Sequence, residues 1–305
     1  MKSIPKVSIV TPIYNGIADT VAYLESLREV CYANFDVTIV DDGSTDGSSA
    51  VIALEFPSVR VLTGDGNLWW SGGTNLGIRD ALARGADFIL TMNNDVKVAP
   101  GFLDALIGCA MDNPGAIVGG KIYFLDDPER IWSAGGKLSW ADGKTFKMLG
   151  HGEPDAPEFS NRKAVDFFTG MCVLIPASVF PRIGLYDASH FPQYHADSEF
   201  TLRARRAGIP IIFEPAAKVW NRVESTFMQR FTRQGALGLR ETVELLTSFR
   251  SPMNLRQYWI LHRDYCPLPL IPVAFALRVA RLLLFLCRIK RALARGGEAM
   301  NRIGT

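Results

Sequence analysis

The first 120 residues alternate short apolar runs with segments of helical periodicity, and this alternation most constrains the fold. The apolar runs expected to form strands are 7–10, 37–40, 59–62, 88–92 and 116–119. The segments expected to form helices are 19–32, 48–55, 74–84 and 101–111. Strands that alternate with helices at this spacing favour a mostly parallel sheet flanked by helices. We therefore predict an α/β chain with a Rossmann-like sheet.

The pattern changes after about residue 120. Residues 126–163 are rich in Gly, Pro, Asp and Lys and lack clear periodicity, which indicates a long loop or small hairpins. Later segments give two expected strands and one helix, at 165–175, 211–214 and 197–207. From residue 227 the chain is mainly helical and increasingly basic. We expect one domain over residues 1–225, with halves at 1–120 and 121–225, and a helical C-terminal region over 226–305.

Composition and cysteine usage exclude several classes of protein. A net charge of +2 is too small to indicate a nucleic-acid partner. The five cysteines are scattered and form no C-x-x-C pair, so we expect neither a disulfide framework nor a zinc site, and a reducing, cytoplasmic compartment is favoured. We expect no signal segment ahead of the first strand, and no clean transmembrane helix, because no uncharged stretch of about 20 apolar residues is present.

Two expected strands end in carboxylates and amides. Asp41, Asp42 and Ser44 follow the run at 37–40, and Asn93-Asn94-Asp95 follows the run at 88–92. In open α/β sheets ligands bind at the carboxyl ends of the strands. Carboxylates at that edge suit a hard divalent cation and the phosphates that it carries. These residues can also simply cap turns, but their shared position at strand ends favours a ligand site.

Two more segments are expected at the same edge. The first strand ends in Thr11, Pro12, Tyr14 and Asn15, where the tyrosine could flank a base. A glycine-rich segment before the third expected helix contains Asn67, Trp70, Gly73 and Asn75. Glycine lets a backbone approach a ligand closely, and a helix N-terminus favours an anion. The segment lacks the Gly-Lys-Ser/Thr ending of a phosphate loop. No dinucleotide fingerprint follows the first expected strand, which argues against a NAD-dependent enzyme.

Asp197 and Glu199 stand at the start of a later helix. Glu199 and Arg203 are four residues apart, so we expect them to pair along the helix face. Asp197 precedes the helix body and could project into a cleft as a general base. His195 is a rival candidate for the same role.

Taken in order, these motifs resemble the family 2 inverting glycosyltransferases, which have a GT-A fold, and particularly their rhamnosyltransferase-like members. The resemblance covers about residues 5–225. Its motifs are 7–15, Val40-Asp41-Asp42-Gly43-Ser44, the 67–77 segment, Asn93-Asn94-Asp95, Phe168-Thr169-Gly170, 184–187 and 197–204.

The resemblance implies roles for single residues. Asp41 and Asp42 would hold the nucleobase and ribose of a nucleotide-sugar, and Asp95 would bind Mg²⁺ or Mn²⁺ as the last acid of the D-x-D motif. Asp197 matches the catalytic base, and Thr169 and Gly170 would border the sugar and the acceptor. Residues 1–120 would be the nucleotide-sugar half and 121–225 the acceptor half.

Three departures from the family pattern concern the metal and the base. Asn93 replaces the first acid of the metal motif, and it supplies a neutral oxygen where an anion is usual. Ala196 stands where relatives often have Glu, and Asn221 where many have a histidine. These departures keep open a catalytically weak sugar-binding scaffold subunit.

The implied reaction is inverting transfer of a sugar from a nucleoside-diphosphate donor to a saccharide or lipid-linked saccharide, in surface polysaccharide synthesis. Deoxythymidine-diphosphate-rhamnose and a uridine-diphosphate sugar are the two donors considered. A metal-dependent nucleotidyltransferase is the alternative enzyme class, although Thr11–Gly16 carries no Lys or Arg to hold a triphosphate.

The C-terminal segment 267–287 is strongly apolar but is interrupted by Arg278 and Arg281. Arginines recur here at helical spacing, at positions 278, 281, 288, 291 and 295. A helix with a basic stripe beside an apolar face can lie in an anionic membrane interface. We predict peripheral attachment to the inner face of the cell membrane. A helix packed on the rest of the chain, or on a second subunit of a homo-oligomer, is the alternative.

Overall fold

The computed structural model describes residues 4–222 and 238–294 of the 305-residue chain. The chain divides into two compact units. Unit 1 comprises residues 1–137 and 148–222, and unit 2 comprises residues 138–147 and 223–305.

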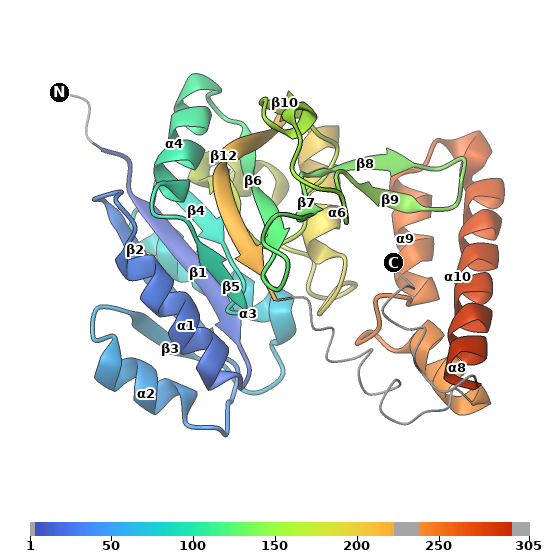
Figure 1. Cartoon of the computed structure of the whole chain (residues 1–305), viewed down its shortest axis with the longest axis horizontal. Helices are drawn as coiled ribbons and strands as arrows, with labels where there is room; N and C mark the ends of the chain where they lie inside the picture. Colours follow the sequence, from blue (N-terminus) through green and yellow to red (C-terminus); the bar gives the residue numbers. More distant parts are fainter. Residues whose placement is uncertain (1–3, 223–237, 295–305) are drawn as a thin grey trace. The chain divides into compact units, whose positions relative to one another are not determined.

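Unit 1 is built on one mixed sheet (Figure 1). Its first five strands are β1 (Val7–Ile13), β2 (Phe35–Asp41), β3 (Arg60–Thr63), β4 (Phe88–Thr91) and β5 (Val96–Val98). Its later strands are β6 (Ile117–Phe124), β7 (Ile131–Ser133), β10 (Lys163–Ala164), β11 (Val173–Pro176) and β12 (Ile211–Asn221). The main path runs β10-β12-β6-β11-β4-β1-β2-β3, and β5 and β7 pair with β12 and β6. β1, β2, β3 and β4 are parallel neighbours, so their carboxyl ends share one edge, as the alternation predicted.

The antiparallel strand β11 is where the sheet departs from the sequence prediction. It pairs antiparallel with both β4 and β6 and so separates two parallel groups of strands. The expected strand at 165–175 was too long: residues 165–172 lie outside the assigned strands, and β11 begins at Val173. The expected strand at 211–214 was too short, because β12 continues to Asn221 through a register shift between Glu214 and Lys218.

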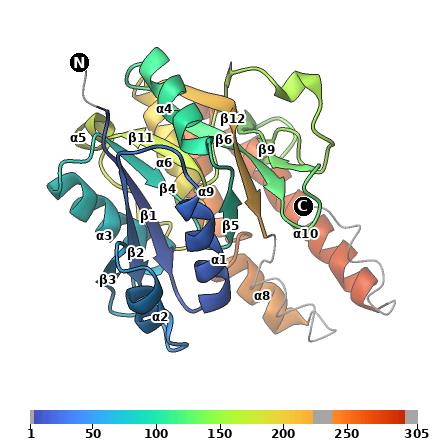
Figure 2. The same cartoon turned by 60° about the vertical axis from the view of Figure 1, so that its left-hand side comes forward.

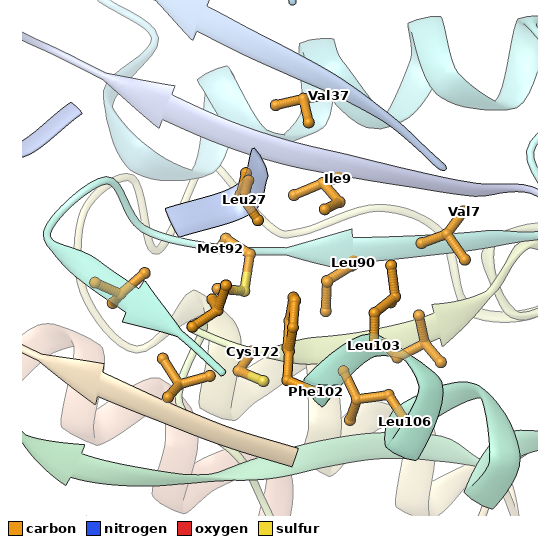
Figure 3. Close-up of a cluster of buried hydrophobic side chains, with 14 of the residues drawn as sticks. Val7, Ile9, Leu27, Val37, Leu90, Met92, Phe102, Leu103, Leu106 and Cys172 are labelled. Atoms are coloured by element: carbon orange, nitrogen blue, oxygen red, sulfur yellow. The ribbon is translucent and has the colours of Figure 1, made fainter. Parts of the chain in front are cut away.

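The helices of unit 1 are α1 (Ile17–Arg28), α2 (Ser48–Glu55), α3 (Trp69–Ala83), α4 (Phe102–Asp112), α5 (Phe180–Ile183) and α6 (Ala196–Arg206), with short 3₁₀ turns η1 (Pro157–Phe159) and η2 (Ala177–Val179) (Figure 2). The core between β1, β4, α1 and α4 contains Ile9, Leu27, Leu90, Phe102 and Leu106, all nearly or fully buried (Figure 3). Burying each such side chain contributes about 1.5–3 kcal/mol. This packing fixes the helices against the sheet and therefore fixes the loops at its carboxyl edge.

Two helix starts differ from the sequence prediction. The first helix was expected to begin at residue 19, but α1 begins earlier, at Ile17, with Gly16 in a left-handed conformation at the N-cap. α3 begins at Trp69 and not at the expected residue 74, so Gly73 lies inside the helix, as Gly77 does, and not in a preceding loop. A Cβ atom on Gly77 would lie 2.4 Å from Val10 Cγ1, and one on Gly73 would lie 2.9 Å from Pro12 Cβ. These glycines allow α3 to approach the sheet closely.

Unit 2 combines a hairpin with C-terminal helices. The hairpin consists of β8 (Gly136–Ser139), whose first residues belong to unit 1, and β9 (Thr145–Met148). The helices are α8 (Leu239–Thr247), α9 (Leu255–Tyr265), the 3₁₀ turn η3 (Leu268–Leu270) and α10 (Ile271–Ala294). Short hairpins were one of two expectations for residues 126–163, and β8–β9 confirms them for part of that range.

The long helix α10 presents an apolar face to solvent. Two of the arginines expected on a basic stripe face the hairpin: Arg278 donates to Lys144 O at 3.2 Å and stacks 3.8 Å from the Tyr258 ring centroid, and Arg281 donates to Asp142 O at 3.0 Å. Exposed apolar side chains recur at turn spacing at Val273, Leu277, Ala280 and Leu284. Arg295 lies outside the described residues.

By length and composition, residues 268–291 form a helix that could cross a membrane, and most of it is exposed. The sequence pattern predicted no clean transmembrane helix, because Arg278 and Arg281 interrupt the apolar stretch.

Candidate active site

The loops that follow β1 and β2 are tied to each other. Asp41 Oδ1 accepts a hydrogen bond from Ser44 N at 2.8 Å, and Asp41 Oδ2 accepts one from the Ser49 hydroxyl. Asn15 N donates to Ser44 Oγ at 2.7 Å, and Asn15 Oδ1 accepts from Thr45 N at 2.8 Å. Asn15 holds a left-handed backbone, with φ of 59°, which asparagine tolerates better than most residues. The carboxylate and the amide therefore organise one end of the site.

Asp42 is directed toward the start of α3. Its Oδ1 accepts from Gly66 N and its Oδ2 accepts from Trp69 N, both at 2.9 Å. Only 6% of the residue is exposed. The carboxylate satisfies the N–H group of Trp69, the first residue of α3, which has no intrahelical partner, and it complements the helix dipole. Asp42 thereby sets where Trp69 and Trp70 lie.

Trp70 connects this end of the site to the segment after β4. Its indole Nε1 donates to Asn93 Oδ1 at 3.0 Å, and its backbone N donates to Gln193 Oε1 at 3.3 Å. Its ring meets Tyr186 edge to face, with centroids 5.3 Å apart. An indole N–H is only a donor, so the atom of Asn93 that faces it must be the amide oxygen. The Asn93 NH₂ group is consequently directed elsewhere.

The Trp70 ring also packs on Gly170. A Cβ atom at Gly170 would lie 2.4 Å from Trp70 Cζ2 and 3.2 Å from Asp197 Cβ, so only glycine fits there. Gly170 N donates to Asp197 Oδ2 at 2.6 Å, and Ser198 N donates to Asp197 Oδ1 at 2.7 Å. A continuous set of contacts thus runs from Asn93 through Trp70 and Gly170 to Asp197.

Asp197 lies in the first turn of α6, where burial raises the pKa of its carboxyl above the usual 3.8 although the Ser198 and Gly170 N–H groups oppose the shift. A raised pKa makes the carboxylate a better proton acceptor near neutral pH. The neighbouring Glu199 is held bidentately by Arg203, at 3.0 and 2.9 Å, which confirms the expected helix-face pair. His195 is the left-handed N-cap of α6.

Asp95 and Asn221 lie side by side where β4 gives way to β5. Asn221 is paired with Val96 in the sheet, and Arg222 N donates to Asp95 O at 2.9 Å. Asp95 Oδ1 and Asn221 Oδ1 are both buried, and neither has a hydrogen-bond partner among the described residues. Burial raises the pKa of Asp95 to about 6; Asp19 adds to this shift and Arg222 opposes it.

Two unpaired buried oxygens at neighbouring positions are the donor type that Mg²⁺ and Mn²⁺ prefer. Within residues 4–222 and 238–294, no three His, Cys, Asp or Glu side chains are placed to hold a metal ion. The two oxygens come from one carboxylate and one amide. This number of ligands suits a cation that takes further oxygens from substrate phosphates and water.

Several other predicted residues bond within the protein. Thr11 Oγ1 and Tyr23 Oη share a hydrogen bond at 3.0 Å, and Asn94 Nδ2 donates to Thr20 Oγ1 at 2.9 Å. The Asn75 amide is 4% exposed and exchanges two hydrogen bonds with the Tyr186 backbone, at 2.8 and 3.0 Å. These three polar side chains join α1 and α3 to neighbouring segments.

The remaining predicted residues leave groups free for a ligand. Tyr14 is 64% exposed at the end of β1, and Pro12 beside it is half-buried against α3. Thr169 Oγ1 is buried without a partner in the part of the chain that the structure describes. Asn67 is exposed, and its side chain contacts Asp65 O at 3.4 Å.

Nothing in the sequence indicated Gln193, which positions Trp70, because it comes from a segment without periodicity. Tyr186 was noted only as part of the 184–187 motif, and Asn221 only as a departure from a family pattern. The position of Asn221 after an apolar strand was the same signal that identified Asp95.

Comparison with known proteins gives matches among glycosyltransferases. A family model described as "Glycosyl transferase family 2" matches residues 8–179. An N-acetylglucosaminyl-diphospho-decaprenol L-rhamnosyltransferase of Mycobacterium tuberculosis is 28% identical over 65% of this chain and 69% of its own length. Glycosyltransferase GlyG of Streptococcus pneumoniae is 26% identical over 61% of this chain and 59% of its own.

Two solved structures share the fold. GalNAc-T7, solved with UDP, GalNAc and Mn²⁺, has a TM-score of 0.59 at 15% identity, over 72% of this chain and 44% of its own. A mannosyltransferase from Pyrobaculum calidifontis, solved with GDP-Man and Mn²⁺, has a TM-score of 0.55 at 16% identity, over 98% of this chain and 81% of its own. The expected GT-A type of fold is confirmed by these structures.

Proposed function

The chain belongs to glycosyl transferase family 2, and on that premise we propose that it transfers rhamnose from a nucleoside-diphosphate donor to a lipid-linked saccharide, with inversion at the anomeric carbon. The family match favours glycosyl over nucleotidyl transfer. The observation that carries the proposal is the connected set Asn93–Trp70–Gly170–Asp197, which holds one proton acceptor in contact with the segment that follows β4. The product would be used in surface polysaccharide synthesis.

The donor's nucleoside would lie at the ends of β1 and β2. Tyr14 is exposed there for stacking on a base, and the loops that Asp41 and Asp42 organise present backbone groups beside it. The carboxylates would act on the ribose and base largely through these loops, because each of their oxygens already accepts a bond from the protein.

The diphosphate would lie by Asp95 and Asn221. Their unpaired oxygens fit Mg²⁺ or Mn²⁺ and would hold it. A bound divalent cation offsets the charge that builds on a leaving phosphate. The NH₂ group of Asn93, which Trp70 orients, would donate a hydrogen bond to a phosphate or sugar oxygen. Asn93 would therefore act as a donor beside the metal, where the family pattern has an acid.

Asp197 would remove the proton from the acceptor hydroxyl as its oxygen attacks the anomeric carbon. The two backbone N–H groups on its carboxylate fix its orientation, and its raised pKa favours proton acceptance. Thr169 Oγ1, unpaired and next to Gly170, would contact the sugar. The transition state has oxocarbenium character, as in glycoside hydrolysis.

The test of this function is Asp197→Asn, measured with deoxythymidine-diphosphate-rhamnose, Mn²⁺ and a polyprenyl-diphosphate-linked N-acetylglucosamine. We expect transfer to fall by about 10²–10⁴-fold, the usual contribution of a general base. Donor binding, followed by the rise in melting temperature that the nucleotide-sugar produces, should be retained. Transfer at the native rate by the variant would remove Asp197 from the mechanism. Donor hydrolysis by the native protein would also separate an active enzyme from a scaffold subunit.

We also propose that unit 2 brings the enzyme to the membrane that holds its acceptor. The support is the exposed apolar stripe Val273, Leu277, Ala280 and Leu284 on α10. Replacing Val273, Leu277 and Leu284 together by Glu should abolish flotation with anionic liposomes, because exposed apolar residues drive interfacial binding. Replacing exposed Leu54 and Leu239 by Glu is the matched control. Equal flotation of all three proteins would count against α10 as the membrane contact.

A further inference from the structure

A groove in unit 1 follows β6 and β12 on the face of the sheet opposite to Asn221. Two adjoining cavities of 620 and 320 Å³ share Asp155 and Lys218, so they form one continuous depression. Both are open to solvent over much of their area. None of the residues proposed above for the donor or for catalysis lines either cavity.

Alternation along β12 separates the groove from the metal site. Successive side chains of a strand point to opposite faces. Ala217 and Val219 belong to the core that α4 covers, and Asn221 shares their face. Lys218 and Trp220 are on the other face and line the groove. Trp220, at one end of the groove, is therefore next to Asn221 in the chain. This end lies at the edge of the sheet where the donor is proposed to bind.

The floor at that end is a pair of stacked aromatic rings. Tyr123 of β6 and Trp220 of β12 are register partners, with centroids 5.7 Å apart and planes 19° from parallel. The Tyr123 hydroxyl donates to Asp155 Oδ2 at 2.6 Å, which fixes its ring. Trp220 remains partly exposed. A flat, immobilised aromatic surface with fixed polar groups at its rim suits the C–H face of a sugar ring.

The charged groups of the groove are nearly balanced. Lys121 is buried and donates to both oxygens of Asp155, at 2.8 and 3.0 Å, and Arg162 binds Glu214 and Asp112. Lys218 is exposed, and no ion pair with it is found in the described part of the chain. Paired charges of both signs offer hydrogen bonds without a strong net field. This favours an uncharged, hydroxyl-rich ligand over a polyanion.

We propose that this groove binds the part of the acceptor saccharide that precedes the sugar to be extended. The outer face of Trp220, backed by the buried Tyr123, would stack on one ring, and Asp155 and Lys218 would bond its hydroxyls. The inference rests on the proposed function, and it extends the acceptor beyond the single lipid-linked N-acetylglucosamine of the transfer test to a saccharide of at least two sugars.

Binding is tested directly with chitotetraose, followed by saturation-transfer-difference NMR and calorimetry on the full chain. We expect binding by the native protein and at least tenfold weaker binding by Trp220→Ala, with Trp220→Phe intermediate because it keeps a ring. Trp259→Ala, at an exposed tryptophan in unit 2, is the matched control and should bind as the native protein does. Melting temperatures verify that each variant is folded.

A second measurement separates this proposal from the proposed function. Trp220→Ala should lower kcat/KM for a tetrasaccharide acceptor at least tenfold more than for a monosaccharide acceptor, since only the longer acceptor reaches the groove. Absence of sugar transfer by the native protein, with chitotetraose binding intact, would defeat the proposed function alone. Three results would contradict saccharide binding in the groove. These are equal chitotetraose binding by the native protein and Trp220→Ala, no binding by the native protein, and displacement of chitotetraose by inorganic pyrophosphate.

Discussion

The two ends of the candidate site use the same kinds of side chain in opposite ways. After β2, all six carboxylate oxygens of Asp41, Asp42 and Asp46 accept hydrogen bonds from the protein itself. After β4, Asp95 Oδ1 and its neighbour Asn221 Oδ1 are buried and accept none from the described residues. An unpaired buried polar group costs about 1–3 kcal/mol. The loop after β2 is therefore held rigidly by its own hydrogen bonds. At the segment after β4, a ligand that binds the two unpaired oxygens would relieve their free-energy cost.

Acidic clusters at strand ends can therefore have different roles, one structural and one in ligand binding. Asp42 stabilises the start of α3 and so positions Trp70, and Trp70 orients Asn93 beside Asp95. The loop after β2 thus influences the segment after β4 through one side chain, that of Trp70. Substitutions that affect stability at one end and ligand binding at the other would show this division.

The largest effect is expected from Asp95→Ala. Removing a carboxylate that holds a catalytic metal costs several kcal/mol of transition-state stabilisation, so transfer should fall by at least about 10²-fold. Stability should not fall, because the variant loses a buried acid with an unpaired oxygen. Calorimetric Mn²⁺ titration and thermal unfolding measure the two effects. A variant that binds Mn²⁺ as tightly as the native protein would show that Asp95 does not bind the metal.

Asp42→Ala should have the reverse pattern. It leaves Gly66 N and Trp69 N without their acceptor, at about 1–3 kcal/mol each. We expect a melting temperature lower by about 2–4 °C per kcal/mol for a domain of this size. Glu55→Ala, at an exposed acid near the end of α2, is the control and should change stability by less than about 0.5 kcal/mol. Unchanged melting of Asp42→Ala would show that its bonds are not structural.

The sequence predicted the parallel part of the sheet and the strand-end clusters because both depend on local patterns. The alternation of apolar runs identified β1, β2, β3 and β4 within a few residues. It could not reveal that β11 runs antiparallel between β4 and β6, since pairing direction depends on long-range contacts. It also could not separate the role of Asp42 from that of Asp95. Both follow apolar strands, and only the positions of Gly66 and Trp69 N–H groups distinguish them.

The acid side of the pH profile should report Asp197. Burial raises the pKa of this carboxyl above 3.8, so the unprotonated base is lost as pH falls through that raised value. We expect kcat to fall tenfold per pH unit below it at saturating Mn²⁺. A proton and a metal ion compete for Asp95, so a limb due to Asp95 would shift with Mn²⁺ concentration. A limb that keeps shifting up to saturating Mn²⁺ would contradict the assignment to Asp197.

The smallest effect is expected from Asn93→Asp, which restores the acid of the family pattern. The new carboxylate can still accept the Trp70 indole N–H, but it loses the NH₂ donor and adds a negative charge near Asp95. Mn²⁺ should bind more tightly, by up to about tenfold, because a second anion favours the cation. Turnover should fall a few-fold because the hydrogen bond to the donor is lost. A cycle with Trp70→Phe checks the mechanism: if Trp70 acts by orienting this amide, the two substitutions are non-additive. Additive effects would mean that Trp70 does not act by orienting the Asn93 amide.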